Sequence, residues 1–146
     1  MEVFAVTADS PWREKAVAFA EGAPWAAAPG FAARLREYRY EDYEAPIIAV
    51  VDSRVAGFCC LSKTDWLAES PEEPWTGAVF VGEAFRGQRI SGQMVAYAES
   101  LAKAAGFSVM HIATGEVGLY EKYGYREAEK RLSVTGIPQR LLVKDI

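Results

Sequence analysis

Histidine and cysteine, on which much nucleophilic and metal chemistry depends, are scarce in this chain of 146 residues. The single histidine, His111, leaves no basis for a Ser-His-Asp or Cys-His arrangement, and no cluster of ligand side chains indicates a metal site. The two cysteines, Cys59 and Cys60, are adjacent in an apolar run typical of a strand, which sends their side chains to opposite faces. A disulfide framework is therefore excluded, and no bound metal is expected.

Long apolar segments and an excess of positive charge are also missing. No segment approaches the roughly 20 apolar residues that a helix needs to cross a bilayer, and the N-terminus has no basic region followed by an apolar stretch. The net charge is -4, and the basic residues are scattered, which argues against binding nucleic acid through its phosphates. We therefore expect a cytoplasmic protein without membrane or nucleic-acid partners, better matched to cationic small molecules.

The composition is otherwise that of an ordinary globular protein, with 51% hydrophobic and 25% charged residues, and residues 1–146 are expected to form a single domain. Apolar periodicity and turn residues predict a series of helices and strands. The helices are expected at 10–22, 31–38, 90–105 and 118–123, the strands at 3–6, 47–51, 55–61, 77–81, 107–113 and 141–143, and a surface loop at 68–76. This order implies a mixed α/β sheet with one right-handed parallel crossover near its centre.

The crossover contains a candidate anion site in the loop Arg86–Gly92, between the strand at 77–81 and the long helix. A strand that runs through a glycine-containing turn into a helix presents unpaired backbone N–H groups at the positive end of the helix dipole. Gly87 and Gly92 permit close approach of a ligand, and Ser91 can cap the helix or donate a hydrogen bond. The alternative is an ordinary capped helix that binds no ligand.

This stretch resembles motif A of the GNAT N-acetyltransferase superfamily, in which Arg or Gln, two residues, Gly, one residue and then Gly or Ala follow a strand and open a helix. The resemblance implies a largely antiparallel sheet flanked by helices, with one parallel strand pair forming a cleft for acetyl-CoA. It also implies that Phe80 and Val81 pair through their backbone with the pantetheine arm. The residues expected to bind the pyrophosphate are Arg86, Gly87, Gln88, Arg89, Ile90, Ser91 and Gly92.

Two positions depart from the family pattern. Arg89 stands where the pattern has its first glycine, and Ser91 stands where it has a second glycine or an alanine. Ser91 is small, and an Arg89 with right-handed helical backbone angles can point its side chain outward toward phosphate or solvent. Neither departure excludes cofactor binding.

The segment Gly118–Tyr125 resembles the second signature of the same family, a short helix bearing Tyr-x-Lys-x-Gly-Phe, with Tyr125 in place of the phenylalanine. The resemblance implies that Tyr120 is the general acid that protonates the coenzyme A thiolate. A tyrosine with an ordinary pKa of about 10 is protonated at neutral pH and can donate to a thiolate of comparable basicity. The alternative is an aromatic residue that only packs in the core.

Candidates for the remaining roles are less specific. Glu83, or alternatively Glu116, could accept the proton of the acceptor amine through water, although either could be a solvated surface carboxylate. His111 is better explained as a structural histidine than as a base. The segment Tyr38–Glu44 combines aromatic and acidic side chains, which suits recognition of a cationic amine but equally an ordinary loop packed against the fold.

These features predict an enzyme that transfers an acetyl group from acetyl-CoA to an amine of a small molecule or peptide by direct attack on the thioester. An acyl-CoA-binding or regulatory module without catalytic activity is the alternative, and a homodimer remains open. A nucleotide-binding P-loop is disfavoured because the loop lacks the Gly-Lys-Ser/Thr ending.

Overall fold

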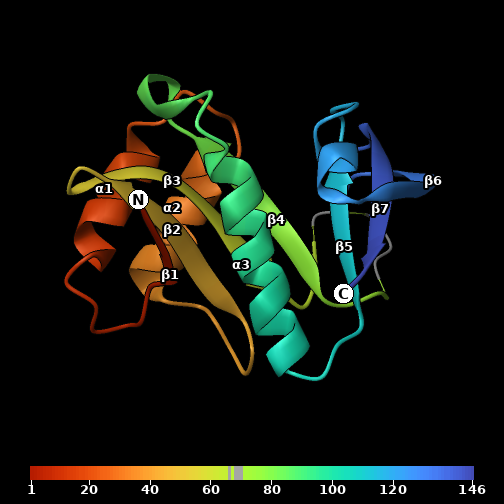
Figure 1. Ribbon diagram of the computed structural model, residues 1–146, viewed down its shortest axis with the longest axis horizontal. Helices are drawn as coiled ribbons and strands as arrows, with labels where there is room; N and C mark the ends of the chain where they lie inside the picture. Colours follow the sequence, from red (N-terminus) through yellow and green to blue (C-terminus); the bar gives the residue numbers. More distant parts are fainter. Residues whose placement is uncertain (66, 68–70) are drawn as a thin grey trace.

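A seven-stranded mixed sheet forms the centre of the computed structural model, which describes residues 1–65, 67 and 71–146 (Figure 1). The strands are β1 Glu2–Ala5, β2 Ala45–Val51, β3 Arg54–Ser62, β4 Trp75–Val81, β5 Val109–Thr114, β6 Arg126–Leu132 and β7 Pro138–Asp145, in the spatial order β1-β2-β3-β4-β5-β7-β6. Neighbouring strands are antiparallel except β4 and β5, which are parallel. The largely antiparallel sheet with one parallel pair confirms the predicted fold class.

Helices cover both faces of the sheet. Helices α1 (Arg13–Glu21) and α2 (Ala28–Glu37) pack on one face, and α3 (Ile90–Ala104) crosses the other (Figure 1). Two short 3-10 helices, η1 (Glu83–Phe85) and η2 (Tyr120–Tyr123), precede α3 and follow β5. Among the described residues, no helix combines the length and the apolar character that crossing a membrane requires.

The central strand β3 is buried on both faces. The apolar core therefore consists of two clusters, one on each face of the sheet. Cys59 belongs to the apolar cluster under α3, whereas Cys60 belongs to the cluster under α1 and α2. Successive residues of a strand face opposite sides of the sheet, so the adjacent cysteines lie as expected, and both are free thiols. The two layers of apolar side chains hold β2, β3 and β4 rigidly between the helices.

Strands β4 and β5 meet at one end only. Their register contains a single pair, Trp75 opposite His111, and from there toward their carboxyl ends the two strands separate (Figure 1). Trp75 is fully buried at this junction, where its Nε1 donates to the Glu72 carbonyl at 2.7 Å and its ring lies 5.3 Å from the His111 ring. The sheet is therefore continuous at the junction and open beyond it.

Several predicted boundaries were wrong, among them the starts of α2 and β4. Helix α2 begins at Ala28, three residues before the predicted start, because Pro29 occupies the first turn, where its missing N–H costs no intrahelical bond. Strand β4 begins at Trp75, inside the predicted loop 68–76, because Trp75 and Thr76 pair with Ser62 and Leu61 of β3. Residues 68–70 of that predicted loop, and Trp66, lie outside the described residues.

Candidate active site

The opening between β4 and β5 contains a cavity of about 760 Å³. Its walls come from α2 and the loop before it, the end of β3 and the residues after it, β4, the end of β5 and the loop after it, η2 and β7. The lining residues are Trp25, Ala26, Ala27, Arg34, Cys60, Ser62, Thr64, Asp65, Thr76, Gly77, Ala78, Val79, Ile112, Ala113, Thr114, Gly115, Glu116, Tyr120 and Gln139. A cavity of this size with a few polar groups is typical of a small-molecule site.

A bulge in β4 shapes one wall of the cavity. Ala78 has a left-handed backbone with φ of 52°, and the register with β3 shifts between Phe58 and Cys60. A non-glycine residue in this conformation costs about 1 kcal/mol, and such strain gathers at functional sites. The bulge lies beyond Trp75, where the edge of β4 that faces β5 has no registered partner among the described residues.

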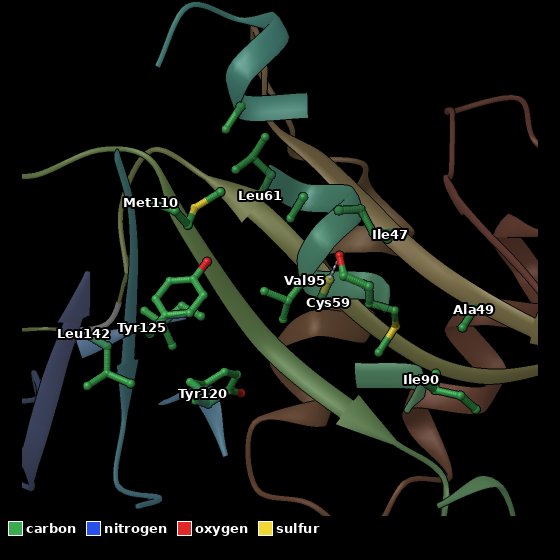
Figure 2. Close-up of a cluster of buried hydrophobic side chains, with 14 of the residues drawn as sticks. Ile47, Ala49, Cys59, Leu61, Ile90, Val95, Met110, Tyr120, Tyr125 and Leu142 are labelled. Carbon is green, nitrogen blue, oxygen red and sulfur yellow. Dashed lines mark hydrogen bonds between the residues drawn. The ribbon is translucent and has the colours of Figure 1, made fainter. Parts of the chain in front are cut away.

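Tyr120 is the aromatic side chain of η2 that reaches this cavity. It is only 6% exposed, and Figure 2 shows its side chain in the gap between β5 and β4. Desolvation by burial raises the pKa of the phenol above its ordinary value, and the nearby negative charge of Glu116 adds to the increase. The phenol is therefore protonated at neutral pH and can act as a proton donor.

Arg140 of β7 holds η2 in place. Its guanidinium donates to the Glu116 carbonyl and pairs with the Glu121 and Glu127 carboxylates, each at 2.6 Å. Glu121 also accepts the N–H of Gly118 at 3.1 Å. The segment that carries Tyr120 is therefore connected to β7 by side-chain hydrogen bonds at both of its ends.

The loop Arg86–Gly92 forms the turn into α3, as predicted, but Arg89 does not have right-handed helical angles. Its φ and ψ are 60° and 27°, in the left-handed region, and no side chain caps the helix. The family pattern has glycine at this position, and glycine adopts this conformation without steric cost. The expected backbone for Arg89 was therefore wrong, because the turn requires the geometry that the pattern's glycine provides.

Arg89→Gly tests this strain. We expect the glycine variant to be more stable than Arg89→Ala by about 1 kcal/mol, because alanine keeps the left-handed penalty while both substitutions remove the same charge. Urea denaturation of the two variants measures the difference. Equal midpoints would show that the conformation at residue 89 is not strained.

The first turn of α3 is packed against η2. The hydroxyls of Ser91 and Tyr123 are 2.7 Å apart, so the Ser91 side chain is already paired and does not cap the helix. A Cβ at Gly92 would lie 2.9 Å from the Tyr123 ring. Gly92 therefore permits the approach of Tyr123, and its expected part in binding the pyrophosphate stays a prediction. This contact connects the loop at the start of α3 to the helix that carries Tyr120.

Comparison with known proteins identifies the family. A model of the acetyltransferase (GNAT) family matches residues 8–125. The chain belongs to this family. No curated protein sequence matches significantly.

Solved structures with the same fold include several acetyltransferases. An aminoglycoside 6'-N-acetyltransferase from Enterococcus faecium is 14% identical, with a TM-score of 0.74 over 99% of this chain and 97% of that one. A GNAT family acetyltransferase from Elizabethkingia anophelis with acetyl-CoA bound is 21% identical, with a TM-score of 0.65 over 99% and 97%. An aminoglycoside 6'-N-acetyltransferase complexed with coenzyme A is 14% identical, with a TM-score of 0.72 over 99% and 97%. At these low sequence identities, the comparison with solved structures shows a common fold and nothing more.

The other residues expected to bind the cofactor in this GNAT fold lie at the end of β4 and in the following loop. The ring of Phe80 stacks on Trp25 at 5.6 Å on the face of α1 and α2, and Val81 packs on the face of α3. The Val81 carbonyl accepts a hydrogen bond from Arg86 Nε at 3.2 Å. Residues 86–92 do not line the cavity, and Tyr123 and Tyr120 lie between the two regions.

The two carboxylates considered as a base differ in position. Glu83 is exposed on η1 and is not among the residues that line the cavity, whereas Glu116 follows β5 and lines it. A role for Glu83 would therefore require one or more water molecules between its carboxylate and the acceptor amine. Its assignment as the base stays a prediction.

His111 and the segment Tyr38–Glu44, for which a structural role was one of the interpretations, make contacts within the fold. His111 is buried, and its Nδ1 lies 2.9 Å from the Pro74 carbonyl. In the segment Tyr38–Glu44, Tyr38 donates to the Val6 carbonyl at 2.6 Å and Tyr43 packs on Phe107, and no residue of the segment lines the cavity. These side chains pack the domain and do not face the site.

Several site residues could not be found by sequence reasoning. Asp65 and Thr76 lie between the predicted strands 55–61 and 77–81, in a segment without any periodic signal, and an alanine at position 78 gives no sign of a bulge. Arg140 directly precedes the predicted strand 141–143, and only the fold brings it to Glu116 and Glu121.

Proposed function

We propose that this member of the GNAT family is an acetyl-CoA-dependent N-acetyltransferase that acts on an amine. The observation that supports this most directly is a buried, protonated tyrosine in a cavity between two diverging strands, beside an uncapped helix N-terminus. A module that only binds acyl-CoA would not need a phenol at this position. The tyrosine therefore favours the enzyme over the silent module.

The residues present fit coenzyme A. The first amides of α3 have no intrahelical acceptor and no side-chain cap, so Ile90, Ser91 and Gly92 can donate their backbone N–H groups to an anion such as a pyrophosphate. Arg86 and Arg89 add positive charge beside them. Beyond Trp75, the edge of β4 facing β5 has no registered partner among the described residues, which leaves backbone groups for an extended pantetheine arm.

In the proposed reaction, acetyl-CoA supplies the thioester and the amine attacks it directly. The N–C bond forms as the C–S bond breaks, the sulfur takes the proton of the Tyr120 hydroxyl, and the amine loses a proton through water, with Glu83 the predicted acceptor. Desolvation by burial raises the pKa of Tyr120, so its hydroxyl still carries the proton when the thiolate leaves. No enzyme nucleophile is needed.

Incubation with acetyl-CoA and a panel of polyamines, aminoglycosides, amino acids and peptides tests this proposal. We expect release of free thiol that depends on the amine, followed with a thiol reagent. Tight binding of coenzyme A without thiol release from any acceptor would favour the silent module.

Gly87→Val tests the loop. Gly87 has a φ of 84° and no atom within 4 Å of an added Cβ, so valine meets no clash but is strained by the left-handed backbone. We expect weaker binding of coenzyme A, by roughly tenfold, because a strain of about 1–2 kcal/mol displaces the loop amides. Calorimetry measures the affinity, and an unchanged Kd would contradict the assignment of this loop.

A further inference from the structure

Tyr120, the proposed general acid, lies between two other tyrosines. The rings of Tyr123 and Tyr125 lie 6.2 Å and 6.3 Å from its own ring, each at an interplanar angle of 75°. Edge-to-face contacts of this kind are favourable, and they restrict how a ring can tilt. The backbone N–H of Tyr125 also donates to the Tyr120 carbonyl at 3.1 Å. The orientation of Tyr120 therefore depends on where its two aromatic neighbours are held.

A carboxylate of α3 holds the hydroxyl of Tyr125, which lies with Tyr120 in one apolar cluster (Figure 2). The hydroxyl donates to Glu99 Oε2 at 2.7 Å, and Glu99 Oε1 accepts from Lys144 Nζ of β7 at 3.0 Å. Burial, and then the hydrogen bond to Glu99, raise the pKa of Tyr125, so its hydroxyl stays the donor at neutral pH. Because the Glu99 side chain is only 14% exposed, water competes little with this charge-assisted bond.

The hydroxyl of Tyr123 is held at the start of the same helix. It lies 2.7 Å from the hydroxyl of Ser91, in the first turn of α3. Glu99 follows Ser91 by about two turns, so α3 contacts the neighbours of Tyr120 at two separate points. The family patterns have glycine or alanine in place of Ser91 and phenylalanine in place of Tyr125. Neither contact between hydroxyl groups and α3 is therefore part of the shared signatures.

We propose that Glu99 and Ser91 are positioning residues, which fix the phenol of Tyr120 relative to α3. Glu99 acts through the hydroxyl of Tyr125, and Ser91 acts through that of Tyr123. This inference rests on the proposed function, since it explains how the general acid of that reaction is placed. The first amides of α3 are the proposed pyrophosphate site, so one helix sets the positions of both the cofactor and the acid. A displacement of about 1 Å can cost roughly 10²-fold in rate.

Tyr125→Phe removes only the hydroxyl that Glu99 binds. We expect kcat to fall about tenfold, while the Kd for coenzyme A changes less than threefold because the start of α3 is untouched. Tyr123→Phe should also lower kcat, by severalfold. Tyr97→Phe is the matched control, since it removes a tyrosine hydroxyl of α3 that accepts the Ala5 N–H at 3.3 Å, and it should change neither quantity. Thiol release gives kcat, and calorimetry gives Kd.

A double variant separates positioning from stability. Tyr125→Phe alone leaves a largely buried carboxylate oxygen without its donor, whereas Tyr125→Phe with Glu99→Met replaces both partners by apolar groups of similar size. Urea denaturation should show that the double variant regains most of the lost stability, while kcat stays low. Recovery of kcat together with stability would show that the bond only stabilises the fold, and would overturn the positioning role.

Nuclear magnetic resonance follows Tyr120 without turnover. In protein labelled with ¹³C at the ring ε positions of its seven tyrosines, the Tyr120 signal is the one lost in Tyr120→Phe. Glu99→Met leaves both aromatic neighbours of Tyr120 chemically unchanged, so a shifted or broadened Tyr120 signal in its coenzyme A complex reports a displaced ring. We expect this change in Glu99→Met and none in Tyr97→Phe.

The outcomes separate this inference from the proposed function. An unmoved Tyr120 signal in Glu99→Met, with kcat equal to that of the unsubstituted protein, would overturn the positioning role and leave the acetyltransferase standing. A displaced signal in a protein that releases no thiol with any acceptor would support the positioning of the phenol and overturn the catalytic proposal.

Discussion

Tyr120→Phe is expected to lower kcat by about 10²–10⁴-fold while the affinity for coenzyme A changes little. The substitution removes only the hydroxyl, and positioned general acids contribute on this scale. The phenylalanine ring keeps the packing against Tyr123 and Tyr125, whose rings lie 6.2 Å and 6.3 Å from that of Tyr120. Steady-state thiol release gives kcat, and calorimetry gives the affinity.

The pH profile and a matched variant make this test specific. Because burial raises the pKa of the phenol above its ordinary value of 10.0, Tyr120 keeps its proton as the pH rises, and it should cause no alkaline loss of kcat below about pH 10. Tyr38→Phe removes a hydroxyl that bonds the Val6 carbonyl far from the cavity and should leave kcat unchanged. An unaltered rate in Tyr120→Phe would remove this residue from the mechanism.

Trp75→Ala is expected to cost about 3–5 kcal/mol of the free energy of unfolding, the usual range for a large aromatic residue deleted from a core. Trp75 is fully buried, contacts Leu67 and Leu141 in its own apolar cluster, and forms the one registered pair between β4 and β5. Its loss leaves a cavity where the two parts of the sheet meet. Urea denaturation followed by far-ultraviolet circular dichroism measures the change.

Trp75→Phe separates packing from hydrogen bonding at this junction. Phenylalanine keeps most of the apolar contact and loses the bond from Nε1 to the Glu72 carbonyl, for which about 0.5–1.5 kcal/mol is expected. A loss in Trp75→Ala no greater than that in Trp75→Phe would show that the junction does not depend on the bulk of this side chain.

The sequence predicted the fold where local signals were strong. The turn at Asp52 and Ser53 between two apolar runs predicted the β2–β3 hairpin, and both residues have the positive φ of a tight hairpin turn. Because side chains alternate in direction along a strand, the adjacent Cys59 and Cys60 were correctly predicted to lie on opposite faces of the sheet. The helical period after Ile90 predicted α3 to within one residue at its end. In each case the determining interactions are between residues close in the chain.

The parts that escaped prediction depend on contacts between distant residues. Whether Ser91 caps its helix or pairs with Tyr123 is decided by a residue 32 positions away. The start of β4 at Trp75 depends on its pairing with Ser62, and the positions of Asp65 and Glu116 across one cavity depend on how β4 and β5 separate. Local propensity carries no information on any of these distances.

The single registered pair between β4 and β5 bears on how such a protein can change over evolution. Past that pair, the described residues of β4 and β5 form no ladder of main-chain hydrogen bonds, and side chains of α3 bind η2 and β7 instead, as Ser91 does with Tyr123 and Glu99 with Lys144. Substitutions in β6, which contributes no described residue to the cavity lining, can therefore shift the position of Tyr120 without changing the cavity wall. In the proposed enzyme, acceptor preference can change in this way while the fold stays constant.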